Sequence, residues 1–260
     1  MEFGISTASF YPQLTEVTLK ELSRRGISCA EVFFNTLCEI SPSYAQELRR
    51  IADGSGLKIV SVHPFTCAFD SFMLFTGYER RLKDALEWHK HYFEAMNILG
   101  SGIFVFHGDR MQGKLPDEEY YRRFAMLRDI GKQFGVIVAQ ENVERCRSRS
   151  LPFLVRMAEY LGGDFAVVFD NKQAFRSGVG ANEFIDALGD HIVHVHISDN
   201  GPAGDCLPIG KGTADLSSML FRLRNKGYHG RVLVELYGEY LEDKEEVYES
   251  IKRLRTFHLE

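Results

Sequence analysis

The sequence predicts a single (β/α)8 (TIM) barrel domain over residues 1–260, and three observations predict it. Short apolar or β-branched segments alternate with longer helical patterns along the whole chain. Eight such strand–helix units of about 30 residues fill the sequence without a linker or a low-complexity segment. The loop after the first strand, residues 6–10, lacks the glycine-rich turn of a dinucleotide-binding open sheet. We therefore prefer the barrel to a doubly wound sheet.

The predicted strands are nearly continuous apolar runs, as expected for parallel strands that are buried on both faces. We expect them at residues 2–7, 28–34, 58–63, 103–107, 136–141, 165–170, 191–197 and 231–236. Because consecutive β/α units place parallel strands side by side, all eight carboxyl ends should open on one face of the barrel.

Helical periodicity fills the intervals between the strands. We expect helices at residues 14–25, 43–53, 78–99, 117–134, 151–161, 181–188, 215–226 and 242–257. A glycine often marks the turn into the next strand, where a helix end favours a left-handed residue. These glycines are Gly26, Gly56, Gly100, Gly135, Gly162 and Gly227.

The composition is that of an ordinary globular protein, with 45% hydrophobic and 26% charged residues. A net charge of −5 supplies no basic field for nucleic acid, so we expect no nucleic-acid partner. The five cysteines show no CxxC spacing and predict reduced thiols in the cytoplasm. We expect no signal peptide and no membrane segment, because no run approaches about 18 apolar residues.

Four strand ends in the C-terminal half carry an acid or a histidine: Glu141, Asp170, His196 and Glu235. Carboxylates gathered at one barrel mouth repel each other unless a cation or proton balances them. The set therefore predicts one divalent metal ion. Its mostly oxygen donors favour Mn²⁺ or Mg²⁺, with Co²⁺ and Zn²⁺ as alternatives.

Two further histidines, His63 and His107, end the third and fourth strands. We expect both to contact the substrate through hydrogen bonds at the mouth. Two alternatives stay open, a second metal bound by both rings and polar support for the ligands of the first.

The whole chain resembles the xylose isomerase-like TIM barrels. The resemblance rests on the four strand-end residues Glu141, Asp170, His196 and Glu235, and it is supported by the segments VHPF, HVHISD, LPIGKGTADL and GYHGRVLVEL. That family includes sugar epimerases and isomerases, inosose and dehydroshikimate dehydratases, and the more distant endonuclease IV. The resemblance implies one metal held by Glu141, Asp170, His196 and Glu235. It also implies that Glu141 and Glu235 transfer the proton.

The resemblance thus predicts a metal-dependent sugar isomerase or epimerase that works through an enediolate. A dehydratase of a keto-polyol is the first alternative, and an endonuclease IV-like phosphodiesterase or a non-catalytic sugar-binding barrel are the others. The chain differs from the epimerases of this family at one position. Those epimerases usually have a histidine three residues after the aspartate of strand six, and this chain has Gln173 there, after Asp170. The endonuclease would also need a metal-binding histidine where this chain has Gln173, and an Asp-x-His motif where this chain has Asp205-Cys206-Leu207.

The expected partner is a small sugar or sugar acid. Gln173 could hydrogen-bond a substrate hydroxyl or carbonyl, and the ring of Phe65 could pack against a sugar ring. Arg145, in the arginine-rich segment 144–149, and Lys211 are candidates for an anionic substrate group, with a solvated loop as the alternative for the arginines. Exposed helical faces could form a homo-oligomer, as family members commonly do.

Overall fold

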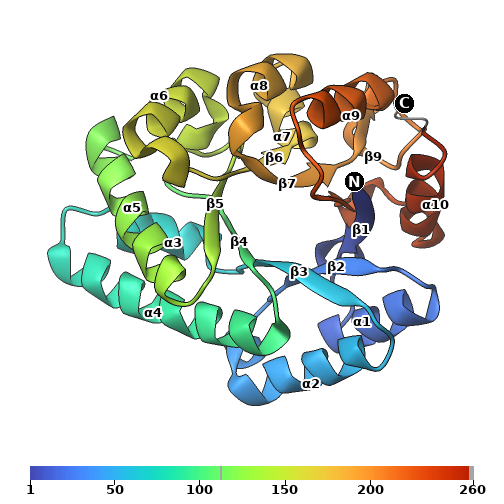
Figure 1. Cartoon of the computed structure of the whole chain (residues 1–260), viewed down its shortest axis with the longest axis horizontal. Coiled ribbons are helices and arrows are strands. Elements are labelled where there is room, and N and C mark those ends of the chain that lie inside the picture. The colour runs from blue at the N-terminus through green and yellow to red at the C-terminus, as the bar shows by residue number, and fades with distance from the viewer. Residues whose placement is uncertain (112, 258–260) are drawn as a thin grey trace.

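The computed structural model describes residues 1–111 and 113–257. Within them, parallel strands close into an eight-stranded barrel in the order β1-β10-β7-β6-β5-β4-β3-β2, which confirms the predicted fold class. Figure 1 shows the strands as a central ring with helices around it. The barrel strands are β1 Glu2–Ser6, β2 Cys29–Phe33, β3 Lys58–His63, β4 Ile103–Phe106, β5 Ile137–Glu141, β6 Val167–Asp170, β7 Ile192–Ile197 and β10 Arg231–Val234.

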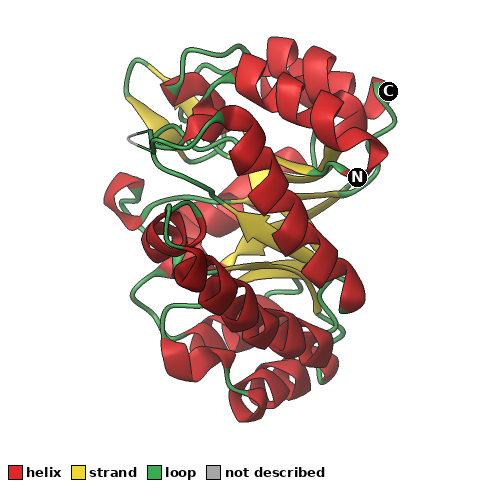
Figure 2. Ribbon diagram, turned by 90° about the vertical axis from the view of Figure 1, so that its left-hand side faces the viewer, coloured by secondary structure: helices red, strands yellow, loops and turns green. Residues whose placement is uncertain are grey.

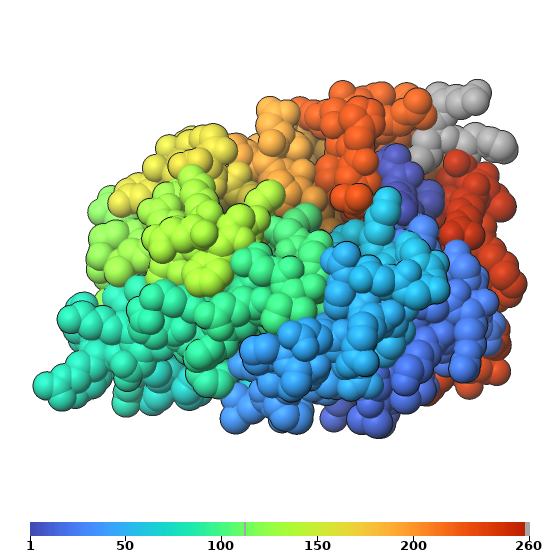
Figure 3. Space-filling view, turned by 60° about the horizontal axis from the view of Figure 1, so that its bottom comes forward, coloured from blue at the N-terminus to red at the C-terminus, as the bar shows by residue number. Residues whose placement is uncertain are grey.

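Helices cover the outside of the barrel (Figure 2). They are α1 Thr15–Arg24, α2 Pro42–Asp53, α3 Cys67–Leu74, α4 Glu79–Leu99, α5 Asp117–Gln133, α6 Leu151–Leu161, α7 Asn171–Arg176, α8 Ala181–Leu188, α9 Leu216–Asn225 and α10 Glu245–Leu254. Neighbours such as α2 and α4 pack against each other and form a continuous outer surface (Figure 3). All six predicted turn glycines have a positive φ, for example 72° at Gly100. None of the described helices is long and apolar enough to cross a bilayer.

Three elements on the loops were not expected from the sequence: α3, α7 and a two-stranded hairpin of β8 Asp199–Gly201 and β9 Gly204–Leu207. The six-residue α7 is too short to show helical periodicity. The side chain of Asp170 caps α7 by accepting a hydrogen bond from the backbone N–H of Gln173 at 3.0 Å. The last barrel strand ends at Val234, two residues earlier than predicted, so Glu235 lies just beyond it.

Strand alternation explains why the barrel mouth is polar. Val105, Ala139 and Val168 form a small buried cluster, whereas Phe104 and Phe169, one residue away along their strands, belong to the larger core cluster that includes the helices. Residues two apart share a face of a strand. His107, Glu141 and Asp170 come two residues after that small cluster, so they face the same interior at the mouth.

Candidate active site

The four side chains predicted as metal ligands meet at the barrel mouth. Glu141 ends β5, Asp170 and His196 are paired across β6 and β7, and Glu235 follows β10. One ligand atom from each lies within 4.8 Å of the others. All four residues are buried, and Glu235 is the most exposed at 6%.

The imidazole of His196 presents Nδ1 to the three acids. Nδ1 lies 3.2 Å from Oε1 of Glu141, 3.7 Å from Oε2 of Glu235 and 3.9 Å from Oδ2 of Asp170. Among the described residues, none donates a hydrogen bond of ordinary geometry to the buried Oε2 of Glu141 or Oδ2 of Asp170. Each of these two oxygens instead lies within ion-pair distance of a nitrogen, Oε2 of Glu141 near His107 and Oδ2 of Asp170 near Lys172. A set of three carboxylates and one imidazole fits a hard divalent cation.

A fifth residue, Glu31 on β2, fixes the orientation of His196. Its Oε2 lies 3.1 Å from Nε2 of His196, 3.3 Å from Nε2 of His194 and 2.8 Å from the donating hydroxyl of Ser61. Glu31 is fully buried. A carboxylate that accepts from the outer nitrogen of a histidine aims the other nitrogen at a metal. Sequence reasoning missed Glu31, because it lies inside a strand rather than at its end.

Lys172, on the first turn of α7, enters the same site. Its buried ammonium lies 2.9 Å from Oδ2 of Asp170 and 2.8 Å from Oε2 of Glu235, and it donates to the hydroxyl of Tyr237 at 3.2 Å. These two carboxylate oxygens are the same atoms that face His196. Lys172 is therefore an internal counter-ion of the carboxylate cluster.

The electrostatics of the site keep both glutamates ionised. Burial raises the pKa of Glu141, but the charges of His107 and His196 outweigh it and hold that pKa well below the ordinary value. Burial likewise raises the pKa of Glu235, and Lys172 and His196 bring it below the ordinary value. Burial lowers the pKa of His196, yet Glu31 and Glu235 raise it well above the usual range. An ionised carboxylate can accept a proton from a substrate carbon.

His63 and His107 lie next to Glu141. Their Nε2 atoms are 2.8 Å apart, and Nε2 of His107 lies 2.7 Å from Oε2 of Glu141. Burial and the neighbouring His107 lower the pKa of His63 to about 4, so its ring is neutral near pH 7. With Cys67, the two rings form a second group whose ligand atoms lie within 4.8 Å of one another.

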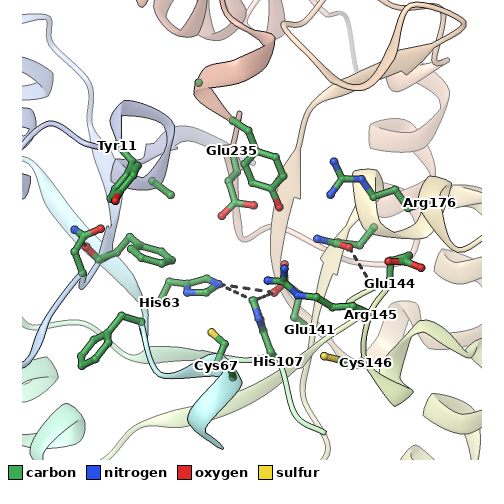
Figure 4. Close-up of a pocket in the computed structure, with 18 of the residues that line it drawn as sticks. Tyr11, His63, Cys67, His107, Glu141, Glu144, Arg145, Cys146, Arg176 and Glu235 are labelled. Atoms are coloured by element: carbon green, nitrogen blue, oxygen red, sulfur yellow. Dashed lines mark hydrogen bonds and ion pairs between the residues drawn. The ribbon is translucent and has the colours of Figure 1, made fainter. Parts of the chain in front are cut away.

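A cavity of about 840 Å³ opens above these residues (Figure 4). Its walls come from several loops and hold seven residues predicted to act in the site, His63, Phe65, His107, Glu141, Arg145, Gln173 and Glu235. Tyr11, Asn35, Arg110 and Tyr237 are lining residues that sequence reasoning did not assign to the site. A volume of this size suits a small-molecule ligand.

Gln173 and Lys211, both predicted to contact the substrate, bind other protein residues in the structure. The buried Gln173 accepts a hydrogen bond through Oε1 from the backbone N–H of Glu144, at 3.0 Å. It therefore ties α7 to the loop after β5. Lys211 forms ion pairs with Glu242 and Glu246, and its side chain is 41% exposed.

Comparison with known sequences identifies one family. A model described as xylose isomerase-like TIM barrel matches residues 19–257. An uncharacterized protein of Methanocaldococcus jannaschii, MJ1311, is 24% identical over 255 residues, which cover 90% of this chain and 83% of that protein.

Solved structures share the fold at low sequence identity. A D-tagatose 3-epimerase-like protein superposes with a TM-score of 0.81 at 20% identity, over 99% of this chain and 97% of that one. The IOLI protein, solved with a binding zinc atom, gives a TM-score of 0.78 at 20% identity, over 98% and 96% of the two chains.

Proposed function

Because the chain belongs to the xylose isomerase-like TIM barrel family, we propose that it is a divalent-metal-dependent isomerase or epimerase of a small sugar or sugar derivative. One observation carries the proposal. Glu141 and Glu235 belong to the four-ligand cluster and also line the cavity, so each carboxylate can reach a substrate there.

Glu141, Asp170, His196 and Glu235 would hold the ion. When bound, it would polarise adjacent carbonyl and hydroxyl oxygens of the substrate and so acidify the C–H bond between them. One ionised glutamate removes that proton, which leaves an enediolate. The protonated form of one glutamate then returns a proton. If the glutamate that took the proton returns it to the neighbouring carbon, the sugar is isomerised. Epimerisation instead needs the other glutamate to take up a proton, from the first glutamate or from solvent, before it donates that proton to the opposite face of the same carbon.

The residues around the two glutamates orient the substrate and keep both carboxylates ionised. The neutral ring of His63 and the ring of His107 offer hydrogen bonds to substrate hydroxyls beside Glu141. Phe65, on the cavity wall, supplies an apolar surface for the sugar carbons. The two glutamates keep their charge without bulk water because His107, His196 and Lys172 surround them.

Names of similar structures support the reaction class and the need for a metal. One is a D-tagatose 3-epimerase-like protein, and the IOLI protein was solved with zinc. The oxygen-rich ligand set of this chain favours Mn²⁺ or Mg²⁺ over Zn²⁺, which commonly takes more nitrogen or sulfur ligands.

Metal analysis of the purified protein, followed by a panel of sugars and sugar acids in D₂O, tests the proposal. We expect one metal ion per chain and deuterium incorporation at a carbon next to the substrate carbonyl. A product lighter by one water would identify the dehydratase instead. Two or three metal ions with cleavage of abasic DNA would identify the endonuclease. Sugar binding without any exchange would show a non-catalytic barrel.

A further inference from the structure

Two loops at the cavity rim are joined into an arch, formed by residues 109–111 after β4 and residues 145–147 after β5. Arg110 and Cys146 form an isolated antiparallel bridge. The backbone N–H of Met111 donates to the carbonyl of Arg145 at 3.2 Å, and the N–H of Arg147 donates to the carbonyl of Asp109 at 2.9 Å. The bridge pairs the backbone of Arg110 with that of Cys146, the residue after Arg145.

The arch carries two arginines without an acidic partner. Arg110 and Arg145 are exposed, both line the cavity, and neither forms an ion pair with a carboxylate in the described part of the chain. Figure 4 shows the Arg145 side chain directed into the cavity. Both guanidinium groups add positive charge to the cavity wall, and a bound anion would neutralise that charge.

Three nearby arginines differ from Arg110 and Arg145, because each of them has an acidic partner. Arg147 is paired with Asp117, Arg149 with Glu144, and Arg176 with Asp205. These pairs hold their side chains within the protein, whereas the guanidinium groups of Arg110 and Arg145 are available to a ligand. Bidentate hydrogen bonding makes arginine well suited to a carboxylate or phosphate.

Gln173 stabilises the arch from below. Its buried amide oxygen accepts from the N–H of Glu144, the residue before Arg145. Since Asp170 caps the helix that carries Gln173, the position of Arg145 is connected to a proposed metal ligand. These two hydrogen bonds connect the position of the arch to that of the carboxylate cluster.

The charge balance of the cavity favours an anionic substrate. The carboxylates of Glu141, Asp170 and Glu235 carry three negative charges, which Lys172 and one divalent ion would neutralise. Of the other lining carboxylates, Glu144 is paired with Arg149, and Glu239, on the short helix Gly238–Tyr240, adds one negative charge on a different segment of the rim. A negative group at the arch thus meets the two positive charges of Arg110 and Arg145, above a carboxylate cluster whose charge Lys172 and the ion would neutralise.

We propose that Arg110 and Arg145 form a subsite for the carboxylate or phosphate of an acidic sugar. The proposal rests on the function proposed above, and it narrows the substrate from sugars in general to sugar acids or sugar phosphates. The carbonyl end of the substrate lies toward Glu141 and Glu235, and its anionic end lies at the arch.

Binding by calorimetry to the Mn²⁺-loaded protein tests the subsite, with D-fructose, D-fructuronate and D-fructose 6-phosphate as probes. These share a keto-hexose skeleton and differ at the terminal carbon. We expect one anionic probe to bind about tenfold or more tightly than D-fructose. A preference for D-fructuronate identifies a carboxylate subsite, and a preference for D-fructose 6-phosphate a phosphate subsite.

Variants connect that preference to the arch. Arg110→Gln and Arg145→Gln should each remove most of the anion preference, measured as the ratio of the affinity for the anionic probe to the affinity for D-fructose on the same variant. Arg50→Gln, on α2, removes one positive charge elsewhere and should keep the preference. Equal binding of charged and neutral probes, no binding of either anion, or a preference that survives both arch variants would overturn the proposal. Proton exchange in D₂O is scored separately, so an anion preference without exchange would refute only the proposed reaction.

Discussion

The carboxylate of Glu31 lies 3.1 Å from Nε2 of His196, while Nδ1 of the same ring faces the carboxylates of Glu141, Asp170 and Glu235. The ring therefore connects a buried acid of β2 to the proposed metal ligands on the opposite part of the barrel. An imidazole that donates to Glu31 through Nε2 keeps the lone pair of Nδ1 for a metal.

Replacing Glu31 with glutamine should weaken metal binding. The amide lacks the charge that orients His196 and increases its basicity, so we expect the Mn²⁺ affinity to fall about 10- to 100-fold. Competition with a fluorescent chelator measures it. Glu39→Gln, at another buried glutamate, serves as the control. Unchanged affinity in Glu31→Gln would show that Glu31 has no part in ligand orientation.

Replacing Lys172 with methionine should strengthen metal binding. The ammonium contacts Oδ2 of Asp170 and Oε2 of Glu235, the oxygens that would bind the ion, and it repels a divalent cation. We expect the Mn²⁺ affinity to rise about tenfold or more. The exposed Lys211→Met is the matched control. Weaker binding in Lys172→Met would instead mean that the lysine holds the ligands in place.

Metal affinity should depend on pH. Although burial lowers the pKa of His196, Glu31 and Glu235 raise it well above the usual range, so the metal-free ring is protonated near neutral pH. Binding must release that proton, and affinity should therefore rise with pH by up to about tenfold per pH unit. Calorimetry in buffers of different ionisation enthalpy measures the released protons. Binding without proton release would contradict this assignment.

The sequence predicted the parts of this site that lie at strand ends. Period-two alternation and the parallel strand order were enough to bring Glu141, Asp170 and His196 to one mouth. Glu31 escaped prediction because its partner His196 is 165 residues away in sequence, and barrel closure alone unites them. The contacts of Lys172 depend on α7, a helix too short to recognise by periodicity. The arch depends on a bridge between two irregular loops, which no sequence pattern specifies.

A buried pair outside the site should make stability depend on pH. Burial lowers the pKa of His89, but Asp70, 3.6 Å away, outweighs it and raises the pKa above the ordinary value. A raised folded-state pKa stabilises the fold below the unfolded pKa of about 6.5, and this is lost as pH rises through the folded value. His89→Gln should therefore lower the Tm more at about pH 6 than at about pH 9. An equal loss at both pH values would rule out this linkage.

The central claim is that Glu141 and Glu235 transfer a proton to and from a substrate carbon. The most direct measurement is substrate-dependent deuterium incorporation from D₂O at saturating Mn²⁺, with the metal content of each variant determined alongside. The account predicts incorporation by the natural protein and by Glu239→Gln, which alters an exposed carboxylate of the same cavity. Glu141→Gln and Glu235→Gln should each reduce it about a hundredfold or more. Metal-loaded glutamine variants that exchange as fast as the natural protein would contradict the account.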